Sequence, residues 1–306
     1  MLSDMPLGFS KIIKYEWLEY TVRTCIDVDR ISEIVTDGNS ERVQSSGLDF
    51  KGQIGLFDDL DTQYSEVSTV KDSKTAKKYG IGRKEQALIR EALHLYLADK
   101  VSVHSISPDN NRDKAVGILS KIWLSVPPNV VELRDDALEL YGEISNSEHI
   151  VLHWGMTSAV YPFVFLVAET VGRLLRFQET FTLSQVRERV EGILGDRPTV
   201  YYALPKVLYS FVDWGVLKRI QNSKGVYAGT EPISIKNQYL IAWLLEAVLY
   251  AKGVSSLPLL SVIDSPGLFP FYIEPGVITD YVIRQNPRLT VFRHGMNEDM
   301  VGLAHK

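Results

Sequence analysis

The segment "RPTVYYALPKVLYSFVDWGVLKRIQNSKGVYAG", residues 197–229, decides the predicted fold, because it describes a helix that runs directly into a short hairpin. The helix carries an apolar stripe with helical spacing, formed by Val200, Leu204, Val207, Leu208 and Phe211. Gly215 then interrupts the helix, and the pieces "VLKRI" and "GVYAG", joined by "QNSKG", have the composition of two strands and a turn. Such a unit either grips a nucleic acid or fills a core.

The preceding residues, "FTLSQVRERVEGILGDRPT", predict another helix. Thr182 and Gln185 have the spacing of a capping box, in which two side chains satisfy backbone donors at a helix start. Gly195 is a natural C-terminal stop. The order of helix, turn, helix and hairpin is that of a winged helix-turn-helix, which we expect within residues 181–235.

The second helix of this unit contains a proline, Pro205. A proline inside a helix removes one backbone hydrogen bond and clashes with the preceding turn, at a cost of about 3 kcal/mol. The helix is therefore expected either to kink at Pro205 or to begin near it.

The unit is basic although the chain is acidic. Residues 173–224 contain nine Lys and Arg against five Asp and Glu, a formal charge of +4, whereas the whole chain carries -5. A local cationic patch is what contact with DNA phosphates requires. The candidate DNA-binding residues of this unit are Arg197, Tyr202, Lys206, Tyr209, Lys218, Arg219 and Lys224.

These candidates divide into two roles. Tyr202, Lys206 and Tyr209 lie opposite the apolar stripe and would read base edges in the major groove, while Lys218, Arg219 and Lys224 on the hairpin would contact phosphates. Winged helices also serve as protein-docking modules, so a protein partner is the alternative to double-stranded DNA.

A second copy of the unit is a further hypothesis for the C-terminal region. There, helical segments lead to a hairpin in which "RLTVFR" and "DMVGL" flank "HGMNE". The polar contacts of a second winged helix would be Arg284, Arg288, Arg293 and His294. The alternative is an ordinary helix and hairpin that close a core.

The rest of the chain divides into a mixed N-terminal region (1–80), a helical domain (81–180) and a C-terminal region (236–306). The segment from Lys71 to Glu85 has the composition of an exposed connector. Ser145 and Glu148 form another capping-box pair, and a helical pair is expected from Asn146 to Phe177. Its apolar stretch from Ser158 to Leu175 is interrupted by Pro162, Glu169 and Arg173, which favours a buried helix over a membrane span.

The stretch "HWGMTSAVYPFVFLVAETVGRLLRFQETFT", followed by the winged unit, resembles the BrxA-type accessory proteins of bacterial phage-defence (BREX) systems. The resemblance covers residues 153–229. It implies a small, mainly helical DNA-binding protein of antiviral defence without catalytic chemistry of its own.

Complete motifs for catalysis are missing from the sequence, so neither an enzyme nor a cofactor is expected. The sequence contains no phosphate loop, dinucleotide fingerprint, HExxH or nucleophile elbow. His149 and His153 have the spacing of a shared metal site but lack a third ligand in a compelling position. A metal-dependent nuclease is an alternative, because the sequence contains an acid, Asp37, followed by an acid-x-Lys triplet formed by Asp49 and Lys51.

Composition narrows the remaining choices. The pI of about 5.8 argues against a protein that coats nucleic acid through its overall charge. With one cysteine, Cys25, the chain has no intrachain disulfide, and together with the lack of a secretory signal this favours the cytoplasm. We therefore expect a mainly α protein with small β-hairpins that binds DNA without catalysis. Such a protein would be an accessory component of a phage-defence system or a transcriptional regulator. The alternatives are a protein-interaction subunit of a larger assembly and a metal-dependent nuclease.

Overall fold

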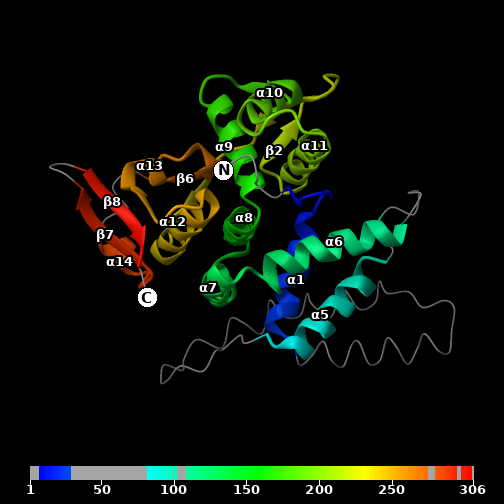
Figure 1. The fold of residues 1–306 in the computed structure, drawn as a ribbon, viewed down its shortest axis with the longest axis horizontal. Helices are drawn as coiled ribbons and strands as arrows, with labels where there is room; N and C mark the ends of the chain where they lie inside the picture. Colours follow the sequence, from blue (N-terminus) through cyan, green and yellow to red (C-terminus); the bar gives the residue numbers. More distant parts are fainter. Residues whose placement is uncertain are drawn as a thin grey trace.

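The computed structural model describes residues 7–28, 81–98, 100–101, 108–274, 280–294 and 298–304. Most of these residues are helical, and the strands form small sheets, which confirms the expected mixture of helices and hairpins (Figure 1). The N-terminal region from residue 31 to 80, with Asp37, Asp49 and Lys51, lies outside the described residues.

The first helices form the lower part of the molecule in Figure 1. They are α1 (Tyr15–Ile26), α5 (Arg83–Tyr96), α6 (Pro108–Trp123) and, after the short helix η4 (Pro128–Val130), α7 (Val131–Tyr141). Helix α1 packs against α5, α6 and α7, so that a segment from the start of the chain closes the core of the helical region.

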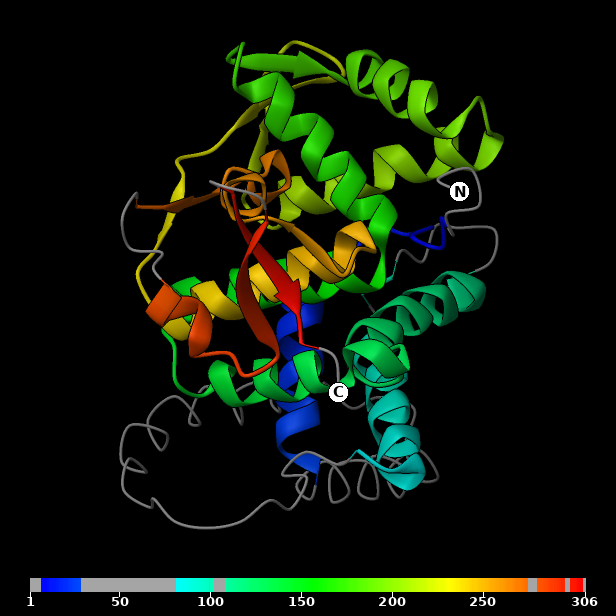
Figure 2. The same ribbon diagram turned by 60° about the vertical axis from the view of Figure 1, so that its left-hand side comes forward.

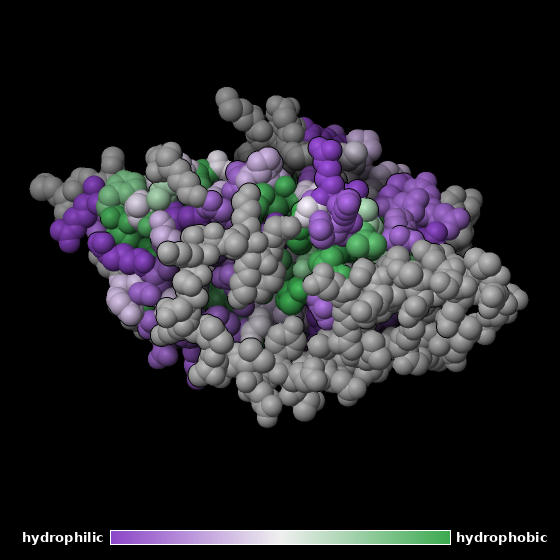
Figure 3. Space-filling model, turned by 90° about the horizontal axis from the view of Figure 1, so that it is seen from below, coloured by the Kyte–Doolittle hydropathy of each residue, from purple (hydrophilic) through white to green (hydrophobic). Residues whose placement is uncertain are grey.

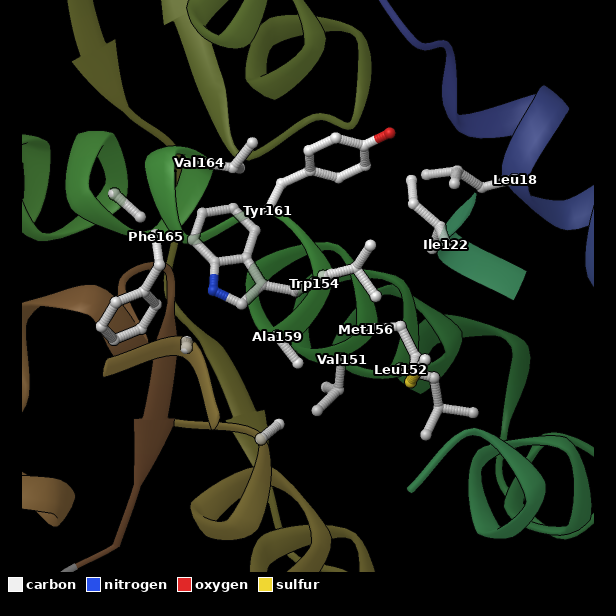
Figure 4. Packing of buried hydrophobic residues seen from close by; sticks show 14 of the residues in the cluster. Leu18, Ile122, Val151, Leu152, Trp154, Met156, Ala159, Tyr161, Val164 and Phe165 are labelled. Atoms are coloured by element: carbon white, nitrogen blue, oxygen red, sulfur yellow. The ribbon is translucent and has the colours of Figure 1, made fainter. Parts of the chain in front are cut away.

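Helix α8 (His149–Val160) lies at the centre of the molecule. All twelve of its residues are buried, as expected for a helix that is apolar on every side. Its residues Val151, Leu152 and Met156 pack among neighbouring helices, and Trp154 faces α9 (Figure 4). The capping box of Ser145 and Glu148 precedes α8 and forms the short helix η5 (Asn146–Glu148), as the spacing predicts.

Helix α9 (Pro162–Leu175) follows α8 after a sharp bend at Tyr161. The predicted helical pair is therefore confirmed, but the stretch from Ser158 to Leu175 is divided between two helices because Pro162 begins a new one. Among the described residues no single helix is long and apolar enough to cross a membrane. Taken together, the segments 146–160 and 162–175 have the length and composition of a membrane span, but they are bent by 117° relative to each other.

The helix–hairpin unit begins with α9 and continues through β1 (Thr180–Thr182), α10 (Leu183–Leu194) and α11 (Pro198–Asp213) to β2 (Leu217–Arg219) and β3 (Val226–Gly229). Its three strands form an antiparallel sheet in the order β1-β3-β2. We call residues 162–229 the first unit. The Thr182–Gln185 capping box and the stop at Gly195 are present as predicted.

Helix α11 starts at Pro198 and runs through Pro205, so the expectation that it begins near Pro205 is wrong. The predicted apolar stripe is fully buried, which offsets the backbone hydrogen bond that Pro205 lacks.

A second set of elements repeats this order in the C-terminal region. It contains α12 (Gln238–Lys252), β5 (Ser256–Pro258), α13 (Leu259–Ile263), α14 (Asp280–Arg284), β7 (Leu289–His294) and β8 (Glu298–Leu303). The strands pair antiparallel in the order β5-β8-β7, so the first strand joins the edge of the hairpin as β1 does. We call residues 238–303 the second unit; its hairpin lies in front of α12 in Figure 2.

The two units are joined through α8 and through a short parallel ladder. Helix α8 packs against both α9 and α12, the first helices of the two units. The ladder pairs β4 (Ile233–Ile235) with β6 (Phe271–Ile273), which follows the short helix η6 (Pro266–Leu268). Seen from below, hydrophobic side chains show near the middle of the molecule, with hydrophilic ones around them (Figure 3).

Candidate nucleic-acid interface

Helix α11 has one face in the core and one directed outward. Tyr202 and Tyr201 are 70% and 50% exposed near the start of the helix, whereas Lys206 and Tyr209 are half-buried further along. The predicted outer face therefore exists, but its most accessible part is the first half of α11. Arg197 is half-buried at the N-cap of the helix.

The C-terminal end of α11 is held by the N-terminal segment of the chain. The backbone N–H of Tyr15 donates to Oδ1 of Asp213 at 2.7 Å, and Nε1 of Trp214 donates to the carbonyl of Ile13 at 2.8 Å. A ligand would therefore approach α11 from its N-terminal half.

The hairpin between β2 and β3 is the most cationic element of the first unit. Lys218, Arg219 and Lys224 are all exposed, and Asn222 and Gly225 adopt positive φ in the turn. A turn of this kind requires residues that tolerate the left-handed region, which explains the sequence "QNSKG". The side chains at the tip therefore extend into solvent.

Two cations lie against tyrosines of α11. The guanidinium carbon of Arg219 is 5.7 Å from the centre of the Tyr209 ring, and that of Arg187, on α10, is 4.3 Å from the Tyr201 ring. Both distances are within the range of cation–π attraction. The pairing of Arg187 with Tyr201 has no signature in the sequence because the two residues lie on different helices.

Tyr209 also faces the hairpin itself. Burial, with a contribution from the neighbouring Tyr209, raises the pKa of Tyr227 on β3 to about 12. Tyr209 thus lies between Arg219 and Tyr227, where it joins the helix to the hairpin. This position differs from the free groove-facing position that the helical spacing suggests.

The second unit uses its cations differently. Arg288 donates from Nε to Glu246 at 2.8 Å and from Nη2 to Asp136 at 2.6 Å, and Glu246 is fully buried in α12. Burial opposes the charge of Arg288, but the hydrogen bonds to these two carboxylates outweigh it and raise its pKa. The guanidinium of Arg288 is therefore occupied by these two carboxylates, and Arg288 is not part of the candidate interface.

The hairpin of the second unit carries mixed charges. Arg293 is 80% exposed but lies 3.4 Å from Asp299 on the opposite strand, while Arg284 on α14 is exposed. Residues 238–303 contain four Lys and Arg against six Asp and Glu, a formal charge of -2. The two units share an order of elements but not an electrostatic character.

His149 and His153 are buried against a carboxylate from near the N-terminus of the chain. Oε1 of Glu19, on α1, lies 2.9 Å from Nε2 of His153 and 3.3 Å from Nδ1 of His149, and it accepts a hydrogen bond from the Tyr15 hydroxyl. No group of three His, Cys, Asp or Glu side chains suited to a metal ion occurs in the part of the chain that the structure describes. The arrangement joins α1 to α8.

The charge states of this cluster follow from its surroundings. Burial opposes ionisation of Glu19, but hydrogen bonds with His149, His153 and Tyr141 outweigh it and hold the pKa of Glu19 well below its usual range. Burial lowers the pKa of His153 more than Glu19 raises it. The cluster is therefore an ionised carboxylate beside a neutral imidazole.

Comparison of the chain with protein-family models, with curated proteins and with solved structures gives no significant match.

Proposed function

We propose that the first unit is a winged helix that binds double-stranded DNA. The proposal rests on the strand order β1-β3-β2 beside α10 and α11. The hairpin next to the outer face of α11 also exposes three cations, Lys218, Arg219 and Lys224. A helix presented next to a basic hairpin can enter the major groove while the hairpin follows the phosphates.

The exposure of each side chain indicates its role in DNA binding. Tyr202, the most exposed of the three candidate readers, would contact base edges, and Arg197 at the N-cap would contact the adjoining phosphate. The hairpin cations would neutralise phosphates without regard to sequence. Tyr209 would contribute to DNA binding indirectly, because its ring would hold the guanidinium of Arg219 toward the phosphate backbone of the duplex.

The second unit supports a second role. Its negative formal charge disfavours contact with phosphates, and Tyr281 on α14 and Phe292 on β7 are exposed. Exposed aromatic side chains are enriched where proteins meet. We infer that this unit, also a winged helix by its order of elements, docks a protein partner.

The resemblance of residues 153–229 to BrxA-type proteins supports a place for this activity in phage defence, and the lack of complete catalytic motifs supports binding without turnover. A titration of labelled duplex at two salt concentrations, with and without Mg²⁺, tests the proposal. Salt-sensitive binding to intact duplex is the expected result. Cleavage in Mg²⁺ would favour the nuclease, and no binding would favour a purely protein-docking role.

A further inference from the structure

The N-terminal segment connects the first unit to the helical region. The backbone N–H of Ile13 donates to Oγ of Ser210 at 2.8 Å, and Ser210 in turn donates to the carbonyl of Lys206, one turn earlier in α11. On its other side the segment is anchored by Phe9, whose ring meets that of Tyr161 edge-on at 5.5 Å. Residues 7–14 are therefore held in place between two parts of the protein.

This placement brings together three lysines that are distant in sequence. Lys11 donates from Nζ to the side chain of Asn111 on α6, and Lys114 is exposed one turn further along that helix. Lys206 lies on α11, one turn before the residue that holds Ile13. We call Lys11, Lys114 and Lys206 the lysine cluster.

The cluster concentrates positive charge that is not neutralised locally. Burial lowers the pKa of Lys11, and the positive charges of Lys114 and Lys206 lower it further. Within the described residues, none of the three ammonium groups has a carboxylate at ion-pair distance. Three like charges converge here from separate elements, and folding brings them together at an electrostatic cost.

A further lysine lies on α6. Lys121, two turns beyond Lys114, lies 4.8 Å from the centre of the Tyr161 ring, the same ring that Phe9 contacts. Lys121 therefore lies on the same face of α6 as Lys114, seven residues further along the helix. The blue N-terminal segment runs between α11 and α6 in Figures 1 and 2.

We propose that the lysine cluster binds the phosphodiester backbone of the duplex beyond the part that the first unit contacts. The inference rests on the proposed DNA binding and extends its footprint onto α6 and the N-terminal segment. In this arrangement Lys206 contacts a phosphate. This differs from the sequence-based prediction, in which Lys206 reads a base edge. Neutralising the charge repulsion would favour binding of any sequence, because phosphates are alike in all duplexes.

The test compares duplexes of about one and about three helical turns. The variant is Lys11→Gln with Lys114→Gln; the matched control is Lys84→Gln with Lys236→Gln, which removes two exposed lysines from α5 and from the loop before α12. On the long duplex, the cluster variant should bind more weakly than the wild type. Its slope of log affinity against log salt should be less steep by about 1.8, the value for two lost phosphate contacts. On the short duplex, variant and wild type should bind alike.

The outcomes separate this inference from the proposed function. If the wild type binds both duplexes but the cluster variant is indistinguishable from it on the long one, the inference is wrong and DNA binding stands. An equal loss in the control pair would reduce the effect to overall charge and would also overturn the inference. If the wild type binds neither duplex, both fail. Should Lys11→Gln lower the melting temperature, Lys114→Gln alone, at an exposed position, provides the same test with half the change in slope.

Discussion

The guanidinium carbon of Arg219 on the hairpin lies 5.7 Å from the centre of the Tyr209 ring on α11. The pair joins the cationic strand to the helix that would enter the groove, and it fixes the direction of a long side chain that would otherwise sample many rotamers. Because a cation–π contact of this kind contributes about 0.5–1 kcal/mol at a partly exposed site, it can orient Arg219 without immobilising it.

Tyr209→Ala should therefore weaken binding to every duplex, and by about the same factor as Arg219→Ala. The double variant should lose little more than either single one, since both changes remove the same oriented cation. Tyr209→Phe keeps the ring and should bind like the wild type. Affinities measured on a preferred and a random duplex check this. A loss confined to the preferred duplex would show that Tyr209 reads bases directly.

Tyr202→Ala should act in the opposite way. Because the side chain is 70% exposed, its removal should leave the melting temperature unchanged. If its hydroxyl contacts a base edge, discrimination between a selected site and random DNA should fall by roughly 1–3 kcal/mol. The measurement is competition binding after selection of a preferred site from a random pool. Unchanged selectivity, with Tyr201→Ala as the neighbouring comparison, would remove Tyr202 from the readout.

Arg288→Ala should destabilise the fold without affecting DNA affinity per folded molecule. The change leaves the carboxylate of Glu246 buried without its charge partner, a loss of about 3–5 kcal/mol for a buried pair. Arg293→Ala is the matched control, because its pair with Asp299 is exposed and should contribute little. Urea denaturation measures both. Similar small effects of the two changes would contradict the buried network.

Stability should fall as the pH is lowered, in two stages. Unfolded His153 takes up a proton near pH 6.5, whereas the folded pKa is lower, so its contribution is full above that pH and declines below it. Glu19 also has a depressed folded pKa, so its contribution is full above about 4.5 and is lost at lower pH. The groups facing it are Tyr15, Arg23, Tyr141, His149 and His153.

Thermal melts between about pH 7.5 and 2.5 check this order, because the second stage lies below the ordinary carboxyl pKa. His153→Gln should flatten the first stage and Glu19→Gln the second, although both variants start from lower stability because they break the link between α1 and α8. A melting temperature independent of pH in the wild type would contradict the ionised-carboxylate arrangement.

Local sequence rules predict the parts of this fold that depend on neighbouring residues. The capping boxes at Ser145 and Thr182, the stop at Gly195 and both hairpins were predictable because each is set by a few adjacent residues. For α11 the sequence left a kink at Pro205 or a start near it open. The start near Pro205 is wrong, since burial of the apolar stripe outweighs the local cost at Pro205.

Long-range partners could not be predicted in this way. Glu19 meets His153 across 134 positions of sequence, and nothing near either residue indicates the other. The same holds for Arg288, which looks like a surface cation in its hairpin until the fold places Glu246 and Asp136 beside it. For the candidate interface, the sequence indicated the cationic hairpin but not the hydrogen bonds of the N-terminal segment to the C-terminal end of α11.

The most direct test of DNA binding by the first unit is a fluorescence anisotropy titration of a labelled duplex with the wild type and with Lys218→Ala combined with Arg219→Ala, at low and moderate salt. We predict that wild-type affinity falls with salt, that the double variant binds all duplexes more weakly, and that its slope against log salt is less steep by about 1.8. An affinity that is independent of salt, or equal in the two proteins, would contradict the proposal that this hairpin follows the phosphates of DNA.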